Sequence, residues 1–401
     1  MSDAMKRDVV VVAGCRTAQG TFGGTLRDVP AHELMKTALC ETIARARVAP
    51  DLVDNVIVGQ VYQTSQALNI ARFCVLDAGL PFTTSGYSIN EACGSSMEAF
   101  NGAVREIAMG ESDVIVAGGA ESMSGVPFLL HGHRWGTRRG SSEVIDQFEE
   151  STWSASTYRY GRFNMGMAAD HVAKVYNLTR REQDEYALRS HQLAVRAIDE
   201  GLFREEIVPF TVKGRKGDVK FEVDEHPRRD SSLESLARLK ATFNDDGTVT
   251  AGSASGVSDG AAAAMLMSRA RADALGVKAF ARVLSTARVA VDPRLICMSP
   301  GPAANLALER AGLKASNIGW WEINEAFSSV VLSSCREIGI PLDRVNPVGG
   351  GIALGHPVGT SGVRTIVTMM HGMRRTGARY GCATIGAGGG MGVAAVLELC
   401  K

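Results

Sequence analysis

The sequence predicts an α/β fold, because short apolar runs rich in β-branched residues alternate with longer stretches of helical spacing. Two further observations agree: glycine clusters at the turns between the apolar runs, and the second part of the chain repeats the order of the first. Along the N-terminal part we expect a strand at 9–13, a helix at 31–46, a strand at 55–60, a further helix, a strand at 86–90, a helix at 95–109 and a strand at 113–117.

Two pairs of segments carry the repeat. Residues 45–58 (RARVAPDLVDNVIV) parallel residues 310–323 (RAGLKASNIGWWEI), and residues 113–119 (DVIVAGG) parallel residues 383–389 (ATIGAGG). The two offsets, 265 and 270 residues, are nearly the same. We therefore expect an internal duplication; the alternative is chance similarity between two α/β units.

A segment of different texture separates the halves. It begins as a loop, is polar and contains paired arginines such as Arg138-Arg139. Its strongest predicted helix runs over 179–201, with Thr179 as the cap and Glu182 three residues later. We interpret the segment as an insertion carried by the first half. The predicted domains are an N-terminal half (1–124 and 249–277), an inserted loop domain (125–248) and a C-terminal half (278–401).

Composition excludes several classes of function. Lys+Arg and Asp+Glu both number 43, which gives no electrostatic reason to expect a nucleic acid or an acidic membrane surface as partner. No apolar stretch approaches the roughly 18 residues that a membrane span needs. The eight cysteines form no CxxC pair, so we expect neither a metal site nor a disulfide framework. These features predict a cytoplasmic enzyme.

Cys93 lies directly after a predicted strand and directly before a predicted helix. The amides and dipole of a first helical turn favour a thiolate, which is the form a cysteine nucleophile needs. Gly94 permits a close approach of the backbone, and Ser95 or Ser96 can accept hydrogen bonds from the first-turn amides. Position alone fits a buried, inert cysteine equally well.

His356 lies in the glycine-dense stretch GGGIALGHPVGTSG, which leads into a helix predicted to begin near Ser361. So much glycine loses considerable entropy on ordering, and backbone crowding around a ligand would explain it. An imidazole here could deprotonate Cys93 and then donate to a developing oxyanion. The alternative is a structural or solvated histidine.

Asn324 and Glu325 follow an apolar strand in the stretch WWEINEAFSS. Such a polar pair at the end of a buried strand is costly unless it binds water, substrate or backbone. The alternative is local hydrogen bonding in a turn.

Together these blocks resemble the ordered signature segments of the thiolase family. The resemblance rests on Cys93-Gly94-Ser95, Asn324–Phe327, Gly355–Pro357, the terminal GAGGGMG at 386–392, and FNDDGTVTAGSASGVSDGAAA at 243–263. It covers nearly the whole chain in order. It implies a five-layered α/β/α/β/α fold of two duplicated halves, with a loop domain that covers coenzyme A.

The resemblance also implies catalytic roles. Cys93 would be the acylated nucleophile, and His356 would activate it. His356, together with a water held by Asn324, would bind the thioester oxygen of the nucleophilic substrate. The backbone amides of Cys93 and Gly388 would form a second oxyanion hole.

For the coenzyme, the resemblance implies that Ser255 contacts the pantetheine, that Phe243 lines its tunnel and that Arg228 lies near the adenine. It places Met165 and Phe327 in the substrate pocket. No cofactor is expected to be bound permanently, and coenzyme A enters as a co-substrate. A homodimer or homotetramer is expected, and the sequence leaves an accessory subunit open.

Two departures from the family pattern concern the substrate pocket. Thiolases usually carry a second cysteine in a Cys-x-Gly triplet, where it moves a proton at the α-carbon, but here the triplet begins with Gly386. Cys382, four residues upstream, is a candidate substitute. Asn164 stands where many short-chain thiolases have histidine, which puts acetoacetyl-CoA specificity in doubt.

These observations predict CoA-dependent cleavage of a 3-oxoacyl-CoA, or the reverse Claisen condensation, through an acyl-Cys93 intermediate. Because Gly386 and Ala387 leave room beside the α-carbon, we expect an α-branched or aromatic substrate; benzoylsuccinyl-CoA is a family precedent. Two alternatives stay open: a decarboxylating condensing enzyme of the same superfamily, and a non-catalytic scaffold subunit. Retention of Cys93, Asn324 and His356 argues against a scaffold.

Overall fold

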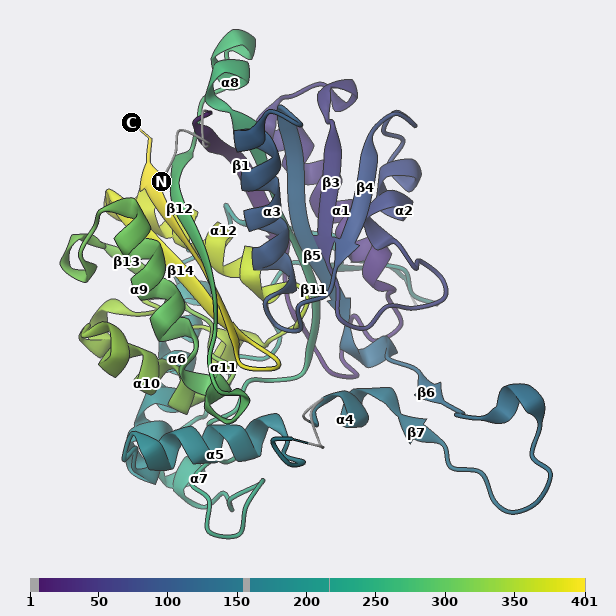
Figure 1. Ribbon diagram of the computed structural model, residues 1–401, viewed down its shortest axis with the longest axis vertical. Coiled ribbons are helices and arrows are strands. Elements are labelled where there is room, and N and C mark those ends of the chain that lie inside the picture. Colours follow the sequence, from purple (N-terminus) through teal and green to yellow (C-terminus); the bar gives the residue numbers. More distant parts are fainter. Residues whose placement is uncertain (1–6, 154–158, 216, 401) are drawn as a thin grey trace.

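Strands from both ends of the chain pair into one continuous path, as the computed structural model in Figure 1 shows. The structure describes residues 7–153, 159–215 and 217–400. Along the sheet the order is β13-β14-β15-β12-β1-β11-β5-β3-β4, and the short strands β2 (Gly20–Thr21) and β8 (Ile207–Val208) pair beside it. The first half supplies β1 (Val9–Thr17), β3 (Asn55–Gly59), β4 (Ser85–Ile89), β5 (Val114–Ser122) and β11 (Ser258–Ser268). The second half supplies β12 (Ala281–Ala290), β13 (Trp320–Ile323), β14 (Tyr380–Ala387) and β15 (Met391–Leu399).

The two halves repeat one strand arrangement about the contact between β1 and β12. On each side of that contact comes an antiparallel neighbour, β11 or β15, and then a parallel pair, β5 with β3 or β14 with β13. Strands β1 and β12 join the halves along the sheet, where Val10 lies beside Arg282 and Val11 beside Ala281. The segments paired by sequence similarity, β3 with β13 and β5 with β14, hold equivalent places in this order.

The helices complete five layers. In the first half they are α1 (Ala31–Ala46), α2 (Ile70–Asp77), α3 (Ser95–Met109) and α8 (Arg269–Leu275). In the second half they are α9 (Pro300–Ala311), α10 (Ser328–Ile338), α11 (Gly351–Leu354) and α12 (Ser361–Thr376). Helices α3 and α12 pack against each other and against strands of both halves, so they form the central layer. Helix α1 covers β1 and β11 on one outer face, and α9 covers β12 and β15 on the other.

Most predicted elements form with small shifts at their ends. Helices α1 and α3 have the predicted bounds, and β5 continues to Ser122, five residues beyond its predicted end. The loop predicted before α12 contains the extra short helix α11.

The segment between the halves carries several short elements. They are β6 (Phe128–Leu129), β7 (Ile145–Asp146), α4 (Gln147–Ser151), α5 (Met165–Val175), α6 (Arg180–Asp199), β9 (Phe210–Val212), β10 (Val219–Phe221) and α7 (Leu233–Ala237). The predicted capping box of α6 is confirmed: Thr179 Oγ1 accepts from the Glu182 amide, and Glu182 accepts from the Thr179 amide. The β6–β7 hairpin projects away from the body (Figure 1). Within the described ranges, no helix is long and apolar enough to cross a membrane.

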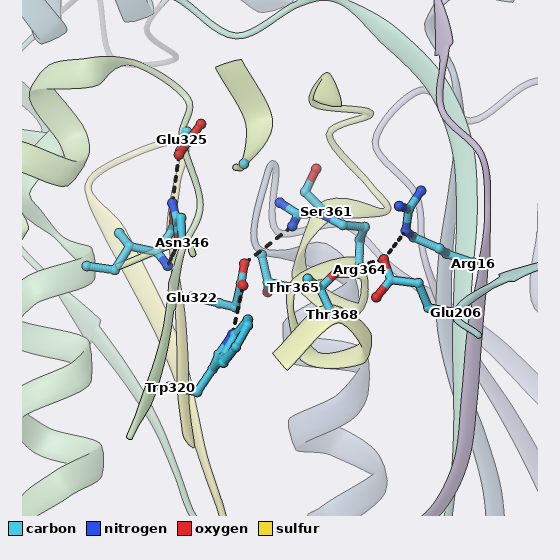
Figure 2. Close-up of polar contacts among 12 residues, drawn as sticks. Arg16, Glu206, Trp320, Glu322, Glu325, Asn346, Ser361, Arg364, Thr365 and Thr368 are labelled. Atoms are coloured by element: carbon cyan, nitrogen blue, oxygen red, sulfur yellow. Dashed lines mark hydrogen bonds and ion pairs between the residues drawn. The ribbon is translucent and has the colours of Figure 1, made fainter. Parts of the chain in front are cut away.

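The buried carboxylate of Glu325 ties the inserted helix α6 to the C-terminal half. Its oxygens accept hydrogen bonds from Tyr186 Oη (2.6 Å), Ser190 Oγ (2.6 Å), Asn346 Nδ2 (2.8 Å) and the Ile352 amide (3.0 Å). Figure 2 shows the contact with Asn346. These internal donors replace the hydration that the Glu325 carboxylate loses on burial. They explain why an acidic residue is tolerated at the end of this buried strand.

Glu325→Ala should therefore destabilise the protein strongly. Truncation leaves several buried donors without their acceptor, for which we expect a loss of about 3–5 kcal/mol in the free energy of unfolding. Glu309→Ala, at the exposed end of α9, is the matched control and should change it by less than about 0.5 kcal/mol. Urea titration measures both, and equal midpoints for the two variants would contradict this role.

Candidate active site

The predicted catalytic residues gather at the carboxyl ends of the parallel strands. Cys93 lies between β4 and α3, Asn324 follows β13, and Gly386 lies near the end of β14. His356 lies between α11 and α12. In parallel sheets, ligand sites form at this edge because the loops that follow the strands meet there.

The turn that carries Cys93 is strained and tightly bonded. Ala92 adopts φ +45°, which is uncommon for a residue with a side chain. Ser95 Oγ accepts from the Glu91 amide (2.9 Å) and donates to the Ala92 carbonyl (2.6 Å). Ser95 thus fixes the turn that presents Cys93. The sequence suggested that Ser95 could cap the first-turn amides of α3, but in the structure it does not.

The Cys93 thiol is protonated at rest. Burial raises its pKa to about 12; a backbone hydrogen bond opposes this, and the nearby carboxyl group of Glu121 adds to it. The amides at the start of α3 favour a thiolate, but the effect of desolvation on the pKa is larger. Cys93 needs a base before it can attack.

Close contact between α3 and the start of α12 brings Cys93 toward His356. A Cβ atom added at Gly362 of α12 would lie 2.4 Å from the Met97 nitrogen of α3. Ser96 Oγ also accepts a hydrogen bond from the Val363 amide (3.0 Å). Only glycine permits this separation of backbones, so the two helix starts are fixed relative to each other.

Protein atoms, and not a ligand alone, account for much of the crowding around the glycine-dense loop. A Cβ atom at Gly119 would lie 2.1 Å from the Gly359 carbonyl oxygen, and one at Gly355 would lie 2.1 Å from Ser258 Oγ. Gly355 also has φ +100°, a conformation that favours glycine. This corrects the interpretation of these glycines as ligand contacts.

Glu121, which no sequence motif marked, links the loop after β3 to the loop that follows His356. Its carboxylate accepts from the amides of Val61 (2.9 Å), Tyr62 (3.1 Å) and Gly359 (2.9 Å). Burial raises its pKa to about 7, although these amides lower it. Its charge also acts on the Cys93 thiol, so Glu121 couples that thiol to the loop that follows His356. The sequence feature that could have indicated Glu121 is the presence of an acidic residue near the end of the apolar strand β5.

The His356 ring is oriented by Ser361. Ser361 Oγ lies 2.6 Å from Nδ1 and donates to the Pro357 carbonyl (3.0 Å), so Nδ1 carries the proton and donates to Ser361. The Nε2 atom, with its lone pair, has no hydrogen-bond partner among the described residues, and His356 is only 5% exposed. Burial, followed by the charge of Arg364, lowers the pKa of His356 to about 3. The ring is a neutral acceptor.

Asn324 adds a second buried polar atom without a partner. Its side chain is 1% exposed, and its Oδ1 has no hydrogen bond within the described residues. The main chain is held by a hydrogen bond from its amide to the Thr384 carbonyl (3.0 Å). Buried polar groups of folded proteins are nearly always satisfied. The orphan atoms of His356 and Asn324 thus indicate a site that a ligand or water completes.

Three of the predicted pocket residues meet in one apolar cluster. Phe243 and Phe327 pack edge to face, with ring centroids 6.0 Å apart, and Phe243 lies against Gly166 beside Met165. The Ser255 amide donates to the Ala326 carbonyl (2.9 Å), which places Ser255 beside this cluster. The next carbonyl along the chain, that of Gly256, accepts from the His356 amide (2.9 Å) and so connects the cluster to the catalytic loop.

The remaining predicted contacts lie apart from this cluster or serve the fold. Arg228 is exposed and borders a surface cavity of about 370 Å³ beside α6. Asn164 caps α5, since its Oδ1 accepts from the Met167 amide (2.8 Å). A cavity of about 560 Å³ opens on α5, and its lining includes neither Cys93 nor His356.

The C-terminal hairpin covers the Cys93 turn. A Cβ atom at Gly388 would lie 2.9 Å from Ala92 Cβ, so the Gly388 backbone is close to the nucleophile. A Cβ atom at Gly386 would lie 3.0 Å from Ser299 Oγ and 3.3 Å from the Ile296 carbonyl oxygen. Ser299 thus occupies part of the space that the missing side chain was expected to leave.

Comparison with known proteins agrees with this geometry. The sequence profile described as "Thiolase, N-terminal domain" matches residues 9–270, and that described as "Thiolase, C-terminal domain" matches residues 277–399. The chain belongs to the thiolase family. It is therefore an acyltransferase that acts on acyl-CoA, and the predicted family and fold are confirmed.

Similar proteins include an acetyl-CoA acetyltransferase from Syntrophomonas wolfei, 43% identical over 98% of this thiolase and 100% of the relative, and the beta-ketothiolase BktB from Cupriavidus necator, 42% identical over the same shares. The crystal structure of Bacillus anthracis acetyl-CoA acetyltransferase has a TM-score of 0.96 at 41% identity over the full length of both chains. The human mitochondrial 3-ketoacyl-CoA thiolase in complex with CoA has a TM-score of 0.95 at 36% identity over 99% of each chain.

The buried state of His356 predicts a pH-dependent stability difference. Its folded pKa of about 3 lies below the ordinary histidine value of 6.5, so the unfolded state binds more protons between these values. Stability from this group is complete above pH 6.5 and falls as the pH drops. From pH 7.5 to 5, wild type should lose about 2 kcal/mol relative to His356→Gln. Urea unfolding at both pH values measures this; parallel losses in the two proteins would contradict it.

Proposed function

We propose that this thiolase cleaves a 3-oxoacyl-CoA with coenzyme A, or runs the reverse condensation, through an acyl group on Cys93. The observation that carries the proposal is the buried, neutral His356 with an unpartnered Nε2, on a loop bonded to Glu121, whose charge acts on the Cys93 thiol. The Nε2 lone pair is free to take the proton of a thiol. Coenzyme A is the co-substrate.

In the proposed reaction, His356 Nε2 removes the proton from Cys93 Sγ, which attacks the 3-oxo carbon of the substrate. The bond between C2 and C3 then breaks, and the acyl-CoA carbanion leaves. Free coenzyme A finally takes the acyl group from Cys93. We assign the backbone amides of Cys93 and Gly388 to the oxyanion of the first addition, and His356 with a water on Asn324 to the enolate oxygen.

We further propose that C2 of the substrate carries a branch or an aromatic group. Gly386 and Ala387 place no long side chain on the part of the C-terminal hairpin that covers the Cys93 turn. The approach of Ser299 to Gly386 limits the extra space to one side. An α-branched substrate such as benzoylsuccinyl-CoA is the specific candidate, and linear acetoacetyl-CoA is the competing one.

The coenzyme and oligomer assignments complete the proposal. Ser255, Phe243 and Arg228 would contact coenzyme A under an insertion that spans 125–248 between the halves. The edge strand β4 pairs on one side only in this chain, and the projecting hairpin exposes 88% of Trp135. Both are surfaces that a homodimer or homotetramer could cover.

The covalent intermediate is the direct test of this function. With 3-oxoacyl-CoA and no free coenzyme A, intact-mass and peptide analysis should find a thioester on Cys93. Cys93→Ser should remove it, whereas Cys40→Ser, which changes an exposed cysteine of α1, should not. An acyl group on Cys297 or Cys382 instead would overturn the assignment.

The substrate proposal is tested at position 386. Gly386→Cys adds atoms within 3.0 Å of Ser299 Oγ, and such overpacking typically costs about 1–3 kcal/mol, or about one to two decades in rate. We expect kcat/KM to fall on α-branched or aromatic substrates and to hold or rise on small linear ones. Steady-state assays over a substrate panel measure this. A wild-type preference for acetoacetyl-CoA, with the variant faster on every substrate, would contradict it.

A further inference from the structure

The proposed cleavage leaves a carbanion at C2 that must receive a proton, yet position 386 has no side chain to supply one. The inference below rests on the proposed function and concerns the source of that proton. In the proposed reaction His356 already holds the Cys93 proton and faces the enolate oxygen. With a separate donor near Cys93, His356 would carry only the Cys93 proton, and the donor would supply the proton at C2.

Cys382, the substitute suggested by the sequence, is too far away. It lies on β14 four residues before Gly386, roughly 13 Å along the strand. Its thiol is fully buried in the C-terminal apolar cluster, and burial is the cause of its raised pKa. Cys382 is therefore part of the core, and the prediction that it could move the proton is not supported by its position.

Three titratable side chains interact electrostatically with Cys93: Tyr62, Glu121 and Cys297. Tyr62 Oη is bonded to Ser151 Oγ (2.7 Å). The Glu121 carboxylate accepts hydrogen bonds from three backbone amides, so its oxygens are already engaged by the protein. Cys297 Sγ has no hydrogen bond to any part of the described chain, so its proton is not committed to another group of the protein.

The position of Cys297 fits a role at C2. It lies in the 3-10 segment η4 (Pro293–Met298), whose Ile296 carbonyl and neighbouring Ser299 border the empty place at Gly386. It is also a buried member of the cluster that holds Phe243 and Phe327. Cys297 thus interacts electrostatically with the nucleophile and packs with the apolar residues assigned to the substrate.

Two buried polar atoms without partners in the described part of the chain independently indicate that a ligand completes this site. Asn324 Oδ1 and His356 Nε2 are both buried and unpartnered within the described residues. Asn324 begins the segment whose Ala326 and Phe327 pack on the Cys297 cluster. A substrate that satisfies these atoms therefore reaches the same apolar cluster from which Cys297 would act.

We propose that Cys297 supplies and recovers the proton at C2 of the substrate. When the C2–C3 bond breaks, its electron pair stays on C2 and takes the proton of Cys297 Sγ, which leaves a Cys297 thiolate. The thiol proton of incoming coenzyme A passes to that thiolate. The resulting coenzyme A thiolate takes the acyl group from Cys93, whose sulfur recovers its proton from His356.

The test separates carbon chemistry from acyl transfer. Cys297→Ala and Cys297→Ser should lower cleavage turnover by about 100- to 10,000-fold, as expected for loss of a positioned acid–base group. Exchange of the C2 hydrogens of a bound acyl-CoA in D₂O, followed by NMR, should fall in parallel. Labelling of Cys93 by a simple acyl-CoA needs no proton at C2, and water can protonate the departing coenzyme A thiolate in place of Cys297. It should therefore fall much less than cleavage and exchange, because Cys93 and His356 are intact.

Cys382→Ala is the matched control, since it removes a buried thiol of the same half, and it should keep both cleavage and exchange. Near-wild-type exchange in Cys297→Ala, with unchanged urea midpoints, would overturn the inference and point to His356 or a bound water. A wild-type protein that neither labels at Cys93 nor cleaves any substrate would refute the proposed function itself, whatever Cys297 does.

Discussion

The close contact between α3 and α12 sets the geometry on which the active site depends. Cys93 precedes one helix and His356 precedes the other, and the helices come from different halves of the chain. Gly362 allows backbone contact there, and the hydrogen bond from the Val363 amide to Ser96 Oγ fixes its register. A side chain at Gly362 would push the two helices apart and separate the nucleophile from its base.

Burial gives this site a neutral resting state. It raises the pKa of Cys93 and lowers that of His356, so both effects favour a thiol and a neutral imidazole over an ion pair. A substrate oxyanion stabilised by nearby N–H donors would change this balance during the reaction. The thiol therefore reacts only when His356 takes its proton.

Much of the fold could be predicted because its signals are local. The apolar runs of β3 and β5, the bounds of α1 and α3, and the capping box at Thr179 depend on neighbouring residues. The repeat also predicted which strands are equivalent. The short helix α11 was missed because four residues among glycines carry almost no helical periodicity.

The site was predicted less completely, since contacts over long sequence distances decide it. The positions of Cys93, His356 and Asn324 followed from their strand and loop contexts. The raised pKa of Cys93 did not follow from the local sequence, because it depends on burial in the folded chain and on the charge of Glu121, 28 positions away. The glycine-dense loop has a composition that fits a ligand or the protein itself, and only the packing of Gly355 and Gly359 distinguishes them.

The dependence of Cys93 on His356 is the central claim, and the rate of alkylation by iodoacetamide tests it most directly. In wild type, peptide mapping over time at neutral pH should show Cys93 modified rapidly, with protection by acyl-CoA. In His356→Gln the same thiol should react at least about tenfold more slowly, because burial keeps it protonated without its base. Equal rates in the two proteins, or faster labelling of another cysteine with no protection by acyl-CoA, would contradict the account.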